Sequence, residues 1–202
     1  GTGINADPGY QRLAVERLAI ISNHPVVAAA DLIEATSDMG AFVLFSGMLK
    51  RTAVKLSKIC NDLRLLSSGP RTGINEINLP ARQPGSSIMP GKVNPVMPEA
   101  TAMVAAQVIG NDAAIAVAGQ SGNFELNVML PTIAQNLLGS IELMANVSRL
   151  LADKAIATFK VNEPKLKEAL SRNPILVTAL NPIIGYQKAA EIAKTAYKQG
   201  RP

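Results

Sequence analysis

The stretch that decides the fold class runs from Phe42 to Leu63 and reads FVLFSGMLKRTAVKLSKICNDL. Its apolar side chains recur about every 3.5 residues, which is typical of a helix seam in a bundle and not of the alternation in a strand. The seam consists of Phe42, Phe45, Leu49, Ala53, Leu56, Cys60 and Leu63. The pattern predicts one long helix from Asp31 to about Ser67. Because Cys60 lies on the seam, it is interpreted as a core residue and not as a nucleophile.

Two further helix patterns of similar length follow along the chain. One covers residues 96–118, and the next carries apolar residues at near-heptad spacing over 126–151. Pro131 lies inside the second pattern and predicts either a kink or a later helix start. Shorter helices are expected at 9–21, after Asn162 and at 187–199, and residues 74–79 alternate like one short strand. The sequence thus predicts an all-α fold, a long-helix bundle with a small helical segment at its C-terminal end.

Composition narrows the class of protein and its partners. Of the 202 residues 48% are hydrophobic but 3% are aromatic, so the core must be aliphatic, which suits helix-on-helix packing. The net charge is +5, but the Lys and Arg residues are scattered and few aromatic rings could stack on bases, so we expect no nucleic-acid partner. The single cysteine cannot form an internal disulfide, and no uninterrupted apolar run has membrane-spanning length. These features predict a cytoplasmic protein that does not bind a membrane.

One segment departs from the helical pattern. Residues 85–95 read GSSIMPGKVNP, and their two glycines and two prolines interrupt any regular element. The segment supplies two hydroxyl groups, an ammonium group and a carboxamide but no carboxylate. Glycine allows the backbone to approach a ligand closely, and a helix that starts beyond Pro95 offers unpaired N–H groups at its positive end. We interpret the segment as an anion-binding loop, although composition alone favours an ordinary turn.

The same eleven residues resemble the signature loop of the fumarase/aspartase superfamily, lyases that release fumarate from a substituted succinate. The similarity extends along nearly the whole chain, from Gly1–Asn5 to Asn181–Tyr186. The helical pattern changes beyond Thr158, and we place a domain boundary near that residue. The resemblance implies that residues 1–158 are part of the central helical-bundle domain of that fold, with the signature loop at 83–95, and that 159–202 begin a small C-terminal helical domain. Members of the superfamily are more than twice as long, so we expect this chain to be truncated.

The resemblance also implies an anti-elimination and a role for each loop residue. A base removes the proton beside a carboxylate, an aci-carboxylate intermediate forms, and the group on the neighbouring carbon leaves. Ser86 matches the base, and Ser87, Lys92 and Asn94 match the groups that bind the substrate. Glu99 matches a carboxylate that pairs with a catalytic histidine from an upstream segment, although a carboxylate in the first turn of a helix also has a purely structural explanation. His24, the single histidine, does not match the superfamily's histidine and is interpreted as an ordinary loop residue.

Different stretches resemble different members of the superfamily. Residues 31–38 and 75–80 are similar to aspartate ammonia-lyases, whereas residues 121–127 are similar to fumarases. The prediction is elimination of ammonia from L-aspartate, with hydration of fumarate to L-malate as the alternative. A non-catalytic helical scaffold is a third reading, but a scaffold would have no use for Ser86, Lys92 and Asn94 together.

The resemblance further implies a homotetramer in which each active site is shared between subunits. The expected small-molecule partner is a dicarboxylate, either L-aspartate or fumarate. No organic cofactor is expected, and the lone histidine, the lone cysteine and the scattered acids form no metal-ligand cluster in the sequence. Because the superfamily builds its site from three segments and this chain carries one of them, we expect the isolated chain to be inactive.

Overall fold

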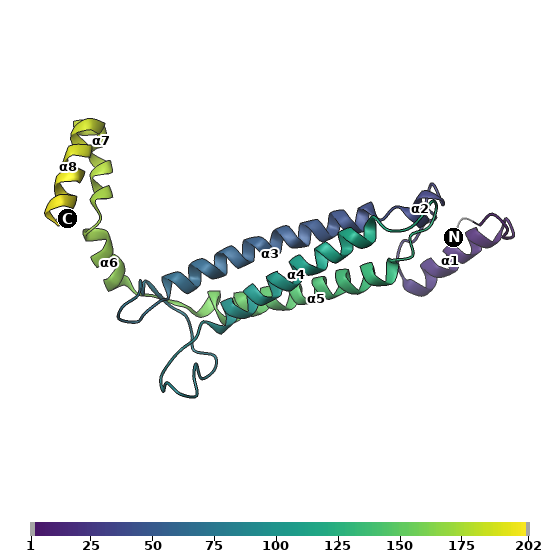
Figure 1. The fold of residues 1–202 in the computed structure, drawn as a ribbon, viewed down its shortest axis with the longest axis horizontal. Coiled ribbons are helices and arrows are strands. Elements are labelled where there is room, and N and C mark those ends of the chain that lie inside the picture. The colour runs from purple at the N-terminus through teal and green to yellow at the C-terminus, as the bar shows by residue number, and fades with distance from the viewer. Residues whose placement is uncertain (1–2, 201–202) are drawn as a thin grey trace. The chain divides into compact units, whose positions relative to one another are not determined.

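The computed structural model describes residues 3–200, and its elements are almost all helices (Figure 1). The predicted all-α class is confirmed. Gly1 and Thr2, at the start of the resemblance, lie outside the described residues. In chain order the elements are α1 (Tyr10–Ser22), α2 (Glu34–Ser37), α3 (Gly40–Leu66), β1 (Ile77–Asn78), α4 (Val96–Gly119), α5 (Leu130–Lys154), η1 (Ile156–Thr158), β2 (Lys160–Val161), α6 (Glu163–Ser171), η2 (Pro174–Leu180), α7 (Asn181–Ile184) and α8 (Tyr186–Gln199).

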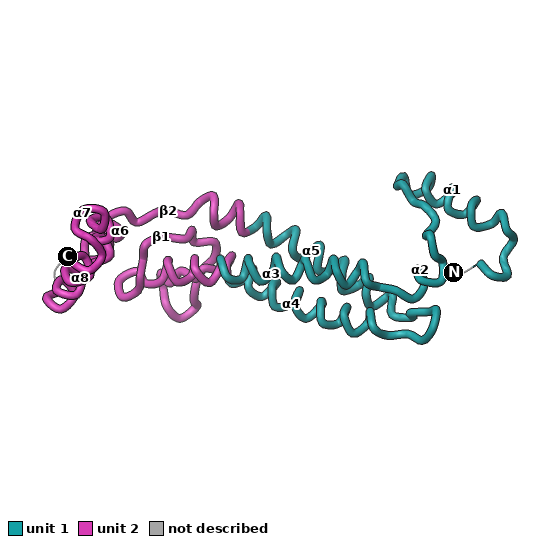
Figure 2. The backbone as a smooth tube through the Cα atoms, turned by 90° about the horizontal axis from the view of Figure 1, so that it is seen from above, with its two compact units in different colours: residues 1–59, 99–150 teal, residues 60–98, 151–202 magenta. Residues whose placement is uncertain are grey.

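The chain divides into two compact units (Figure 2). The first holds the residues up to 59 together with 99–150, and the second holds 60–98 together with the residues from 151 onward. Helices α3, α4 and α5 each contribute residues to both units. The domain boundary near residue 158 that the change of sequence pattern indicates stays a prediction.

The core of the first unit lies between α3, α4 and α5, which run side by side (Figures 1 and 2). One cluster of buried side chains consists of Met39, Ile115, Ala118, Ile133 and Leu137, and another consists of Ala53, Ala105, Val108 and Met144. The many small side chains allow the helix axes to approach closely. Gly119 is the extreme case, because a Cβ atom there would lie 2.7 Å from Cγ2 of Val43.

The predicted seam of α3 is correct over its second half. Ala53, Cys60 and Leu63 are buried, which agrees with the interpretation of Cys60 as a core residue. Phe42 and Phe45, by contrast, are exposed on the single chain. The seam therefore faces neighbouring helices in its second half but is uncovered near its start.

Buried polar groups of the first unit are paired with one another across the helices. Asp112 of α4 accepts a hydrogen bond from Ser46 Oγ at 2.8 Å and also forms an ion pair with Lys50 of α3. Asn111, the next residue on α4, donates to Ser140 Oγ of α5 at 3.0 Å. These two positions interrupt the apolar pattern of α4, and the pairing removes most of the cost of burying them.

The starts of two long helices differ in how well the sequence predicts them. The predicted start of α3 at Asp31 is wrong: the short α2 comes first, Asp38 is extended, and α3 begins at Gly40. The side chain of Asp38 accepts a hydrogen bond from the Gly40 N–H at 3.1 Å, and this local contact favours a new helix start. Helix α5 begins at Leu130, so Pro131 lies in its first turn, where the missing N–H has no helical partner to lose.

Among residues 3–200, α4 is the one helix whose length and composition would allow it to cross a membrane. The core helix of a bundle has the same profile, and α4 contributes Ala105, Val108 and Ile115 to the buried clusters. The polar pair Asn111 and Asp112, which interrupts its apolar pattern, is bonded to α5 and α3 respectively. The profile is therefore weak evidence for a membrane-spanning segment.

The second unit contains the paired strands and the C-terminal helices. Strand β1 pairs antiparallel with β2, with Ile77 opposite Val161 and Asn78 opposite Lys160. Helices α6 and α8 match the short helices predicted after Asn162 and over 187–199. Helix α8 packs on η2. Between β1 and α4 the chain forms the irregular loop that carries most of the predicted site.

The close approach of α3 and α4 makes a testable prediction about packing. Gly119→Ala places a methyl group against Val43, and we expect it to lower the free energy of unfolding by about 1–3 kcal/mol. Gly110→Ala, in the interior of the same helix, meets no atom within 4 Å and should instead stabilise the chain by about 0.5–1 kcal/mol. Denaturant unfolding followed by circular dichroism measures both variants. Equal effects of the two substitutions would contradict this packing.

Candidate active site

The loop between β1 and α4 is closed by hydrogen bonds within itself. The Gly85 N–H donates to the Lys92 carbonyl at 3.0 Å, and Asn94 Nδ2 donates to the Gly85 carbonyl at 2.8 Å. A Cβ atom at position 85 would collide with the Lys92 carbonyl oxygen, so the closure requires glycine there. Residues 85–94 therefore form a closed loop, in which Gly85 at one end is bonded to Lys92 and Asn94 at the other.

Ser86 directly follows Gly85 in this closed loop, and its hydroxyl oxygen accepts hydrogen bonds from two backbone donors. The Ile88 N–H donates to Ser86 Oγ at 3.1 Å and the Met89 N–H donates at 3.0 Å. The side chain is half-buried, whereas Ser87 is exposed. Backbone N–H groups directed at an oxygen favour its anionic form, and this is the arrangement that stabilises developing negative charge in acyl-transfer sites. The two backbone donors on its hydroxyl oxygen therefore distinguish Ser86 from Ser87, the other serine of the loop.

Lys92 and Asn94 occupy the other side of the closed loop. Asn94 is half-buried and donates one amide hydrogen to the Gly85 carbonyl. Lys92 is exposed, and among the described residues its ammonium group makes no hydrogen bond or ion pair. A free ammonium group on an exposed loop without carboxylates is available to an anionic ligand.

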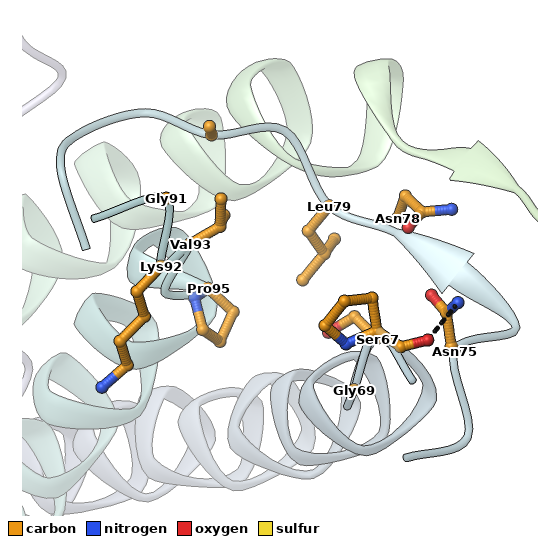
Figure 3. Close-up of a pocket in the computed structure, with 11 residues that line it drawn as sticks. Ser67, Gly69, Asn75, Asn78, Leu79, Gly91, Lys92, Val93 and Pro95 are labelled. Carbon is orange, nitrogen blue, oxygen red and sulfur yellow. Dashed lines mark hydrogen bonds between the residues drawn. The ribbon is translucent and has the colours of Figure 1, made fainter. Parts of the chain in front are cut away.

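A cavity of about 420 Å³ lies within the second unit, beside the C-terminal part of the loop (Figure 3). Its lining residues are Ser67, Gly69, Pro70, Asn75, Asn78, Leu79, Ala81, Gly91, Lys92, Val93 and Pro95. Figure 3 shows the Lys92 side chain extending away from Asn75 and Asn78. Ser86, Ser87 and Asn94 are not among the lining residues, so the cavity contacts the candidate site only through Lys92.

The sequence pattern does not indicate the polar residues Ser67, Asn75 and Asn78 of this cavity as candidate site residues. Asn75 has a positive φ of 51°, and its Nδ2 donates to the Pro70 carbonyl at 2.9 Å (Figure 3). Asparagine tolerates the left-handed region better than other residues with a Cβ atom. An asparagine two residues after Gly73 is therefore a usable signal for a sharp turn, but nothing in the local sequence indicates a cavity.

Four of the predicted site residues lie in one segment of the chain. Ser86, Ser87, Lys92 and Asn94 belong to one closed loop. Glu99 lies in the first turn of α4, and its role beside a histidine stays a prediction. His24 is exposed and its Nδ1 contacts the Asn23 carbonyl at 3.0 Å. No group of three or more His, Cys, Asp or Glu side chains suited to a metal ion occurs in the part of the chain that the structure describes.

Two family models match the chain. A model described as "Lyase" matches residues 1–110, a range that contains the whole loop and Glu99. A second model, described as "Fumarase C C-terminus", matches residues 176–202.

Curated relatives and solved structures extend these matches over the full chain. Aspartate ammonia-lyase of Pseudomonas aeruginosa is 66% identical over 201 residues, which cover 100% of this chain and 42% of that protein. "Fumarate hydratase class II 2" of the same organism is 67% identical over 202 residues, covering 100% and 44%. The crystal structure of fumarate lyase:delta crystallin from Brucella melitensis bound to cobalt has a TM-score of 0.90 at 50% identity, covering 100% of this chain and 44% of that one. The chain thus spans less than half the length of these relatives.

Proposed function

We propose, since this chain belongs to the lyase family of aspartate ammonia-lyases and class II fumarate hydratases, that it is part of an enzyme which eliminates ammonia from L-aspartate to give fumarate. The observation that carries the proposal is the pair of backbone donors on Ser86 Oγ, because the reaction needs a strong base on the loop. The resemblance of residues 31–38 and 75–80 to aspartate ammonia-lyases supports the choice of ammonia as the leaving group.

In the proposed reaction Ser86 is the general base. Its oxygen, as an alkoxide, takes the proton from the carbon next to a substrate carboxylate, and the electron pair of the broken C–H bond moves into that carboxylate to form a dianion. The dianion then collapses, the C–C double bond forms, the C–N bond breaks, and the ammonium group of the substrate leaves as ammonia with the electron pair of that bond. The Ile88 and Met89 N–H groups lower the cost of the alkoxide, and a donor of this kind contributes about 3 kcal/mol in comparable oxyanion sites.

The remaining loop residues are proposed to hold the substrate. Lys92 offers its ammonium group to a substrate carboxylate and partly neutralises the dianion. Asn94 retains one amide hydrogen after bonding to Gly85, and Ser87 offers a hydroxyl group. Glu99 is proposed to act with a histidine that comes from outside this chain, as the family resemblance implies.

We also propose that the enzyme is a cytoplasmic homotetramer with active sites shared between subunits. On the single chain, large apolar side chains of the bundle are exposed: Leu44 by 71%, Met103 by 71% and Leu138 by 64%. Each of the three long helices thus leaves apolar surface that further copies could cover. Light scattering should return the mass of four copies for the full-length polypeptide that carries this chain, whereas a well-folded monomer would contradict this arrangement.

Hydration of fumarate is the second candidate, because the fumarate hydratase of P. aeruginosa is as similar to this chain as the aspartate ammonia-lyase. An ultraviolet assay for fumarate separates the two. With the full-length polypeptide, we expect fumarate from L-aspartate and none from L-malate. Fumarate from L-malate alone would replace the proposed reaction by the alternative, and silence with both would favour the non-catalytic scaffold. The 202-residue chain by itself should give no fumarate with either substrate.

Substitution of the proposed base tests the mechanism. Ser86→Ala should lower kcat by about 10²–10⁴-fold and change KM little, because it removes the proton acceptor and leaves Lys92 in place. Ser171→Ala is the control: this exposed serine on α6 donates to the Glu168 carbonyl of its own helix, so the variant should retain full activity. A Ser86→Ala enzyme with unchanged kcat would eliminate Ser86 as the base.

A further inference from the structure

The strand that leads into the loop is fastened to the chain that leaves α5. Besides the pairing of β1 with β2, the Asn162 N–H donates to the Glu76 carbonyl at 2.8 Å and Asn162 Nδ2 donates to the Asn75 carbonyl at 3.0 Å. These contacts fix the beginning of residues 75–82. They lie at the far end of that segment from Ser86, so they leave open how its other end is held.

Arg82 holds that other end. Its Nε donates to the Lys154 carbonyl at 2.9 Å, and its Nη2 donates to Thr158 Oγ1 at 3.0 Å. Lys154 is the last residue of α5, so its carbonyl is one of the helix-end acceptors that lack an intrahelical partner and carry partial negative charge. The planar guanidinium reaches both acceptors from one edge with two N–H groups in a fixed geometry.

The position of this contact along the chain matters for the proposed base. Only Gln83, Pro84 and Gly85 separate Arg82 from Ser86, and the proline ring restricts the backbone between them. The tip of the loop has no packed anchor of its own, since Ile88 is 86% exposed. The closing hydrogen bonds at Gly85 fix the shape of the loop but do not fasten it to the rest of the second unit.

We propose that Arg82 is a positioning residue for the loop: it fastens the entry strand to the end of α5 and so fixes where Ser86 is held. The proposal rests on the proposed function as far as catalysis is concerned, but its structural part does not. It assigns to Arg82 no contact with the substrate. Loss of the contact frees the entry side of the closed loop, whose exit side continues into α4 at Val96, and this moves Ser86 relative to a bound substrate.

The test uses the full-length polypeptide that carries this chain and two readouts. The first is hydrogen exchange of peptides covering residues 85–92, measured without substrate, and the second is steady-state kinetics. In Arg82→Ala we expect faster exchange in these peptides and a kcat about 10- to 100-fold lower with little change in KM, as for a misplacement of about 1 Å. Arg82→Lys should recover part of the loss, because one donor and the charge remain.

Thr158→Val and a charge-matched control sharpen the test. Thr158→Val removes one acceptor of Arg82, so its effect should largely disappear in the Arg82→Ala background. Arg149→Ala removes an exposed arginine from α5 for which the described structure holds no hydrogen bond or ion pair, and it should match the wild type in both readouts. Because Thr158→Val makes a smaller change, it keeps the test usable if Arg82→Ala does not fold.

The outcomes separate this proposal from the proposed function. Unchanged exchange in Arg82→Ala, or additive effects with Thr158→Val, would overturn the positioning role. If Arg82→Ala exchanges faster but the wild-type enzyme is already inactive on both L-aspartate and L-malate, the positioning role is supported and the proposed function is contradicted. Faster exchange with unchanged kcat would overturn the link between this contact and the placement of Ser86.

Discussion

The hydrogen bond from the Gly85 N–H to the Lys92 carbonyl is the contact on which the candidate site depends. It closes residues 85–92 around Ser86, whose Oγ accepts hydrogen bonds from two backbone N–H groups, and it brings Lys92, the one cation of residues 85–94, into the same loop. A serine hydroxyl without such donors is a weak base. The demand for glycine at position 85 follows from the same contact, because a side chain there would occupy the space of the Lys92 carbonyl.

The helices supply what the loop lacks, a large buried surface. In the first unit the aliphatic clusters between α3, α4 and α5 provide the stability, while the pairing of Asp112 with Ser46 and Lys50 adds a directional contact that apolar packing does not have. A buried polar pair of this kind penalises a shift in helix register, because a shift would leave a carboxylate without its partners. In the second unit the end of α5 has a further use as an acceptor for the entry strand of the loop.

The sequence was informative where the signal was local or repeated. Near-heptad spacing predicted the long helices α3 and α5, and the glycine- and proline-rich run predicted the loop. The start of α3 was predicted wrongly, since the hydrogen bond from Gly40 to Asp38 outweighs a continuing apolar pattern. The contacts of Arg82 and the cavity near Asn75 could not be predicted, because they join residues far apart in the sequence. The leaving group also cannot be predicted from the sequence, because some stretches of this chain resemble aspartate ammonia-lyases and others resemble fumarases.

The central claim is that the closed loop holds Ser86 as a base against the substrate. A crystal structure of the full-length polypeptide with fumarate bound tests it most directly. The account predicts Ser86 Oγ within about 3.5 Å of a methine carbon of fumarate, with the Ile88 and Met89 N–H groups still directed at that oxygen and the Lys92 ammonium on a carboxylate. Fumarate bound with the Ser86 hydroxyl facing away from it, or lodged in the cavity beside Ser67 and Asn78, would contradict the account.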